Sequence, residues 1–85
     1  MNPAFDPKKT RYRVLRTVVE HEAENVGGIS MDEIAEKLEL SGRPAVHYHV
    51  KFLMQEGLVK KGKTGKALIF LNPDDEARLV VKIRG

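Results

Sequence analysis

The sequence predicts one small domain that is mainly α-helical and carries a short β-hairpin, an α+β fold. The chain has 85 residues, which is enough for one modest hydrophobic core. Three segments repeat apolar residues at helical spacing and have capping residues at their ends. Two short apolar runs then flank a turn bounded by glycine, which is the pattern of a hairpin.

The first helix is predicted between the pair Asp6-Pro7 and the pair Gly27-Gly28. Aspartate is a favoured N-cap, and proline is tolerated at the first helical position. Glycine accepts the left-handed conformation that ends many helices. Ile29 follows and is expected to form a very short strand. The apolar residues that recur between the two pairs are Tyr12, Leu15, Val18, Val19, Ala23 and Val26.

A second, short helix is predicted after Ser30. Ser30 and Glu33 form a capping box, in which each side chain satisfies a backbone N–H at the start of the helix. The inner face of this helix consists of Ile34, Ala35 and Leu38. Residues 39–42 then form a tight turn, in which Ser41 can cap the next helix.

The third helix is predicted at about 43–56 and closes at Gly57. Pro44 falls in its first turn, where a missing backbone N–H costs little. The residues that this helix turns toward the core are expected to be Val46, Val50, Leu53 and Met54.

A β-hairpin with a basic tip follows, with strands at 58–61 and 66–71 and a turn at 62–65. The tail, residues 72–85, fits two structures. The pair Asn72-Pro73, the acids after it and the bases near Gly85 are helix-end signals, and their number favours a helix. The alternation of Ala77, Leu79, Val81 and Ile83 with their neighbours is typical of a strand.

This order of elements predicts a winged helix-turn-helix domain. Two helices joined by a turn of four residues make the helix-turn-helix, at about 31–56, and a hairpin directly after it makes the wing, at about 58–71. The whole chain, 1–85, is expected to be one domain. Residues 72–85 form a tail that is a candidate for dimerisation.

The segment ISMDEIAEKLELSGRPAVHYHVKFLMQEGLVKK resembles the DNA-binding domain of LexA-type repressors and, more loosely, ArsR-type winged-helix regulators. The residues that carry the resemblance are DEIAEKLEL, SGRPAVHYHV and KFLMQEGLV. The resemblance implies that the start of the third helix enters the major groove, through Gly42, Pro44, Ala45, His47 and Tyr48. LexA repressors carry a self-cleaving protease domain after a linker, and this sequence does not include one. Self-cleavage is therefore not implied.

Charge along the sequence is segregated, although the net charge is only +3. Residues 1–19 carry a net charge of +4, residues 20–40 carry −6, residues 41–66 carry +5, and the remainder is neutral. An acidic segment therefore separates two basic ones. If the basic segments share a face, that face attracts a polyanion.

The candidate DNA-binding residues lie at three places within the two basic segments. When the apolar stripe of the third helix is buried, helical geometry turns its basic and aromatic residues outward, where they offer donors to phosphates and base edges. On and before this helix the candidates are Ser41, Gly42, Arg43, Pro44, Ala45, His47, Tyr48 and Lys51. In the wing they are Lys60, Lys61, Lys63, Thr64 and Lys66, which are expected to hold the DNA backbone or enter the adjacent minor groove. At the start of the first helix they are Lys8, Lys9 and Arg11, which are expected to contact the backbone.

The run GLVKKGKT, residues 57–64, fits the P-loop pattern G-x-x-x-x-G-K-[ST]. A working P-loop follows a strand and opens a helix, whose N-terminus helps to bind phosphate. Here the run follows a predicted helix and lies within a hairpin. No nucleotide ligand is therefore expected.

Other chemistry finds little support in the sequence. His47 and His49 are two residues apart and do not face each other on a helix, so no metal site is expected. His21 lies among glutamates and is expected to be solvated. The serines are better explained as caps, and no catalytic set emerges, so neither an enzyme nor a cofactor is predicted. The absence of cysteine, of a long apolar run and of a signal peptide indicates a cytoplasmic, nucleoid-associated protein with no membrane contact.

The sequence predicts a regulator of transcription, expected to be a repressor, that binds double-stranded DNA as a homodimer. Specificity from so small a domain normally needs two copies on a pseudo-palindrome. The candidate dimer surfaces are the first helix and the tail, with Leu79, Val80 and Ile83 as the candidate contacts. The alternative is a winged helix that serves as a protein-interaction module in a replication, transcription or viral complex, with the acidic second helix or the tail as its contact surface.

Overall fold

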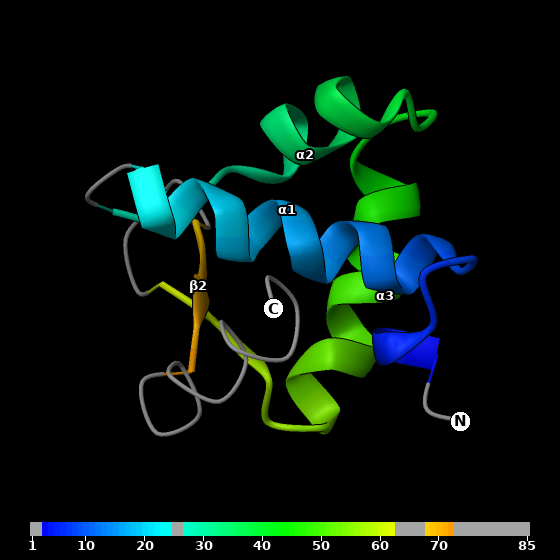
Figure 1. Ribbon diagram of the computed structural model, residues 1–85. Helices are drawn as coiled ribbons and strands as arrows, with labels where there is room; N and C mark the ends of the chain where they lie inside the picture. Colours follow the sequence, from blue (N-terminus) through cyan, green and yellow to red (C-terminus); the bar gives the residue numbers. More distant parts are fainter. Residues whose placement is uncertain (1–2, 25–26, 63–67, 73–85) are drawn as a thin grey trace.

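A computed structural model describes residues 3–24, 27–62 and 68–72 and has the predicted α+β architecture (Figure 1). A short 3-10 helix, η1 (Pro3–Phe5), precedes the helices α1 (Thr10–Glu24), α2 (Met31–Leu38) and α3 (Arg43–Gln55). The strands β1 (Val59–Lys61) and β2 (Ile69–Leu71) follow. The predicted tail structure and the tip of the hairpin lie outside the described residues.

Helix α1 begins three residues later than the sequence predicts. The Asp6 carboxylate accepts a hydrogen bond from the backbone N–H of Lys8 at 3.1 Å, and the Asp6 carbonyl accepts one from Lys9 at 2.9 Å. Asp6 therefore stabilises a turn, and the helix starts only at Thr10. Ala23, one of the apolar residues that recur at helical spacing, is exposed near the end of the helix.

Helix α2 begins at the predicted cap. The Ser30 side chain accepts a hydrogen bond from the backbone N–H of Glu33 at 3.1 Å. The Glu33 carboxylate lies 3.4 Å from Nδ1 of His21 and 3.8 Å from Nζ of Lys37. His21 is thus partly buried between α1 and α2, with 13% of its side chain exposed, and the expectation that it is solvated was wrong.

The turn between α2 and α3 spans residues 39–42 and is built on two residues with positive φ. Glu39 has φ 55° and ψ 40°, and the N–H of Leu40 donates to the Ala35 carbonyl. Gly42 is the N-cap of α3, with φ 136° and ψ −170°, and no side chain caps the helix. The prediction that Ser41 caps α3 was therefore wrong.

Helix α3 buries Val46, Val50 and Leu53, as predicted. Met54 is 41% exposed, although the sequence analysis placed it in the core stripe. It follows Leu53 by one residue, which rotates it about 100° around the helix and away from the core.

The two strands form an antiparallel pair in which Lys60 lies opposite Phe70. Ile29 adds one further bridge, because it exchanges two backbone hydrogen bonds with Ile69, at 3.0 and 2.7 Å. This confirms the short strand predicted there. Next along the same edge of β2, the Glu22 carboxylate accepts a hydrogen bond from the N–H of Leu71 at 2.7 Å.

A single core joins these elements. Helix α1 contacts α2, α3 and β2, and Figure 1 shows it crossing the molecule between α2 and the hairpin. The buried core residues are Ala4, Val14, Leu15, Val18, Val19, Ile29, Met31, Ile34, Ala35, Val46, Val50, Leu53, Leu58, Val59, Ile69 and Leu71. Because α3 packs on both α1 and α2, only its outer face remains available for a partner.

Candidate nucleic-acid interface

The outer face of α3 carries polar and aromatic side chains. His47, Tyr48 and Lys51 are all exposed, on the side of the helix opposite Val46, Val50 and Leu53. Residues three and four apart lie on one face of a helix, so these three side chains form a continuous patch. Within the described part of the chain, neither His47 nor Lys51 forms a hydrogen bond or an ion pair with a side chain. Their polar atoms are therefore available to a ligand.

Tyr48 is 57% exposed, the largest exposure among the big apolar side chains that the structure describes. Its ring makes edge-to-face contacts with His49, at 5.2 Å between centroids, and with Phe52, at 5.3 Å. Such contacts favour a restricted ring orientation. The aromatic surface is thus held outward at the centre of the patch.

Arg43 opens the helix and is paired with α2. Its Nε and Nη2 donate hydrogen bonds to the two carboxylate oxygens of Asp32, each at 2.7 Å. The hydrogen bond from Arg43 holds the pKa of Asp32 below its ordinary value, and the reverse effect raises the pKa of Arg43. Nothing in the sequence singles out Asp32 as the partner of Arg43, because the two residues are eleven positions apart and adjacent only in the folded chain.

Arg11 packs beside the same helix. Its guanidinium carbon lies 4.1 Å from the centre of the Phe52 ring, and its Nε is buried with no hydrogen-bond partner among the described residues. Burial lowers the pKa of His49, and the positive charge of Arg11 lowers it further. Arg11 is therefore less accessible to phosphate than a side chain that projects into water. Phe52, which contacts both Arg11 and Tyr48, is a residue of this interface that the sequence did not indicate.

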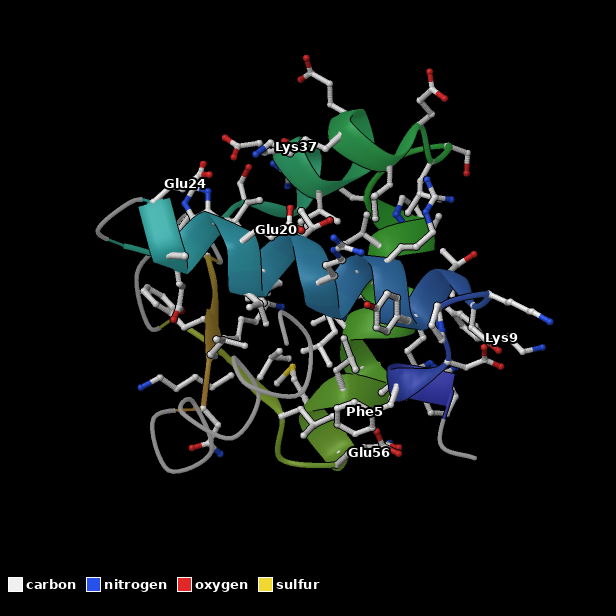
Figure 2. The ribbon with its side chains drawn as sticks, viewed as in Figure 1. Phe5, Lys9, Glu20, Glu24, Lys37 and Glu56 are labelled. Carbon is white, nitrogen blue, oxygen red and sulfur yellow. The ribbon has the colours of Figure 1, made fainter. Side chains whose placement is uncertain are left out.

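The predicted residues before α1, in the turn and in the first part of α3 reach the surface to different extents. Lys8, Lys9, Ser41 and Pro44 are exposed, and Ala45 is half-buried. Figure 2 shows Lys9 at the N-terminal end of α1, pointing away from the body of the molecule, and Glu24 at the opposite end of the helix. Positive and negative charge on α1 are therefore separated along its axis.

In the wing, Lys60 and Lys61 are exposed on β1. The other predicted wing residues, Lys63, Thr64 and Lys66, lie outside the described residues, as do the candidate dimer contacts Leu79, Val80 and Ile83.

The described part of the P-loop pattern, residues 57–62, begins just after the end of α3 and contains the whole of β1. A P-loop needs the opposite order, with a strand before it and a helix after it. In the described ranges, no three His, Cys, Asp or Glu side chains are grouped to hold a metal ion. Nor is any helix there long and apolar enough to cross a membrane.

A comparison with protein families decides the class of this interface. The model of a winged helix-turn-helix DNA-binding domain matches residues 8–60, which is more than half of the chain. The chain belongs to this winged helix-turn-helix family. Its match covers all three helices and reaches into β1, so α2 and α3 are the helix-turn-helix of the family. A search of curated proteins and a search of solved structures found no match.

Membership in this family supports a DNA-binding regulator of transcription, with DNA as the partner of the domain. Domains of this class typically bind rather than catalyse. The family match does not distinguish between LexA-type and ArsR-type regulators.

Proposed function

We propose that the protein represses transcription by binding a specific double-stranded DNA site, with α3 in the major groove. The observation that supports this most directly is the outward patch of His47, Tyr48 and Lys51 on the second helix of the helix-turn-helix. Imidazole and ammonium groups donate to base edges and phosphates, and an aromatic ring can contact a thymine methyl group. The repressor role is supported by the resemblance of residues 29–61 to LexA-type repressors.

Phosphate contacts come, in this proposal, from lysines that flank the patch. Lys8 and Lys9 precede α1, and Lys60 and Lys61 lie on β1, directly after α3. Lys63, Thr64 and Lys66 follow in the sequence and extend the same basic segment. Because phosphates are the same at every base pair, these contacts position the protein on DNA without selecting a sequence.

Two copies of the chain bind together on a pseudo-palindrome, since a single recognition helix reads few bases. The tail supplies the dimer contacts, through Leu79, Val80 and Ile83. In a cell, such a protein acts in the cytoplasm on the nucleoid.

Selection of bound duplexes from a random pool tests the proposal. We expect the wild-type chain to enrich one palindromic sequence. Tyr48→Ala and His47→Ala should broaden the base preference at individual positions, whereas Lys61→Ala should weaken binding to all duplexes alike. Circular dichroism of each variant controls for folding. A pool with no enriched sequence would contradict sequence-specific binding and favour the alternative of a protein-interaction module.

A further inference from the structure

The ion pair between Asp32 and Arg43 is bidentate although both of its side chains are exposed. Both side chains are largely in water, with 62% of Asp32 and 69% of Arg43 exposed. Most exposed ion pairs contribute little to the free energy of folding unless their geometry is bidentate. This pair is bidentate, with two hydrogen bonds of 2.7 Å, which fix the rotation of the guanidinium plane at the start of α3.

The carboxylate occupies only one edge of the guanidinium. Arginine has five N–H donors, and Asp32 accepts from Nε and from one N–H of Nη2. The end of the group, which consists of Nη1 and the second N–H of Nη2, is not bonded to any described residue. Two parallel N–H groups on this end match the O6 and N7 acceptors of guanine, the commonest specific contact in the major groove.

The charge of Asp32 also affects what Arg43 can bind. A phosphate near Arg43 would be repelled by the adjacent carboxylate, whereas the edge of guanine carries no net charge. The pair therefore favours a base over the DNA backbone as the ligand of Arg43. The lowered pKa of Asp32 is consistent with a carboxylate that stays ionised at neutral pH.

We propose that Asp32 is a positioning residue that orients Arg43 to read one guanine in the major groove. This inference rests on the proposed function, and it deepens that function by naming a base and the two residues that select it. Arg43 makes the contact with guanine, and Asp32 acts through Arg43. Pre-orientation reduces the conformational entropy that an arginine side chain loses when it binds.

Duplex selection with four chains tests the inference: wild type, Arg43→Ala, Asp32→Ala and Glu36→Ala. In the wild type we expect a position that strongly prefers guanine, and Arg43→Ala should abolish that preference. Asp32→Ala should reduce it about tenfold, within the range of discrimination that a bidentate contact provides. Its affinity for random duplex should not fall, since a negative charge has been removed. Glu36→Ala removes an exposed carboxylate from the same helix and should leave the preference unchanged.

The outcomes separate this inference from the proposed function. If the wild type enriches a sequence but Asp32→Ala keeps the full guanine preference, the positioning role is wrong and the proposed function stands. If Arg43→Ala keeps the preference, Arg43 does not read the base, and the inference is again overturned. If Asp32→Ala weakens binding to every duplex equally and lowers the melting temperature, the pair has only a structural role. If the wild type enriches no sequence, both proposals are overturned.

Discussion

Arg11 shows how one side chain can change its role once the fold is known. The sequence predicts that Arg11 binds phosphate, but its guanidinium lies over the Phe52 ring and the side chain is half-buried. A cation–π contact and the packing of a long side chain both favour the folded state. Phe52 in turn contacts Tyr48, so Arg11 supports the centre of the outward patch.

Arg11→Ala should therefore lower the free energy of unfolding by about 1–2 kcal/mol, because the cation–π contact and the packing are both lost. Lys9→Ala, in the exposed turn directly before α1, serves as the control and should leave the stability unchanged within about 0.5 kcal/mol. Urea denaturation measures both variants. Equal stability of Arg11→Ala and the wild type would show that this contact contributes nothing to folding.

His49 makes the stability of the protein depend on pH. Burial and the nearby charge of Arg11 hold the pKa of His49 below its ordinary value of 6.5 in the folded state. As the pH falls below about 6.5, the unfolded chain takes up a proton that the folded chain does not bind. Stability from this residue is therefore full above pH 6.5 and is lost as the pH falls toward the folded pKa.

His49→Gln should remove this contribution, because glutamine does not titrate. We expect the urea midpoint of the wild type to fall between pH 7 and pH 5, and that of His49→Gln to fall less. His47→Gln changes an exposed histidine of the same helix and is the matched control. If all three chains lose the same stability over this range, His49 is not the group responsible.

At the scale of elements, the turn before α3 depends on a backbone conformation that glycine tolerates. The φ of 136° and ψ of −170° at Gly42 fall in a region that other residues almost never adopt. The added Cβ would meet nothing closer than Pro44 Cδ, at 3.7 Å, so the cost is one of backbone strain and not of a clash.

Gly42→Ala should lower the free energy of unfolding by about 2–3 kcal/mol because of this strain. Gly57→Ala is the matched control. Gly57 has φ 75°, no atom of a described residue lies within 4 Å of an added Cβ, and the substitution is expected to cost only about 1 kcal/mol. Thermal unfolding followed by circular dichroism compares the two variants. A smaller loss in Gly42→Ala than in Gly57→Ala would contradict the proposed strain.

A side chain of α1 also forms a hydrogen bond with the free edge of β2. Beyond the single bridge of Ile29, the carboxylate of Glu22 on α1 accepts from the backbone N–H of Leu71. This hydrogen bond satisfies a donor that a longer neighbouring strand would otherwise satisfy. It links the C-terminal half of α1 to the wing, so that the position of β2 depends on the helix that also supports α3.

At the scale of the whole molecule, the proposed dimer has a quantitative signature in salt. If each protomer contacts roughly three phosphates, the logarithm of the association constant should fall against the logarithm of salt concentration with a slope of roughly −5. Fluorescence anisotropy with the selected duplex measures this slope. A single protomer would give roughly half that value, and an association that does not depend on salt would contradict phosphate binding altogether.

The sequence predicted the order of elements well because the signals involved are local. Helical periodicity placed α1, α2 and α3, the Ser30 cap marked the start of α2, and apolar runs placed β1 and β2. The errors arose where a local signal has two structural outcomes. Asp6 can cap a helix or a turn, and Met54, at the border of the apolar stripe, can face either side. The candidate patch on α3 followed from the same periodicity.

What the sequence by itself determined is therefore the winged helix-turn-helix class and the face of α3 that is free to meet DNA, because both depend on spacing along the chain. What only the tertiary structure decided is which charged groups are already engaged. Arg43 donates hydrogen bonds to Asp32, which is eleven positions away in the sequence. Arg11 on α1 packs on Phe52 of α3. Glu22 accepts a hydrogen bond from Leu71, which is forty-nine positions away. The physical reason is that such contacts form only when packing of the core brings distant segments together, and no local pattern encodes that distance.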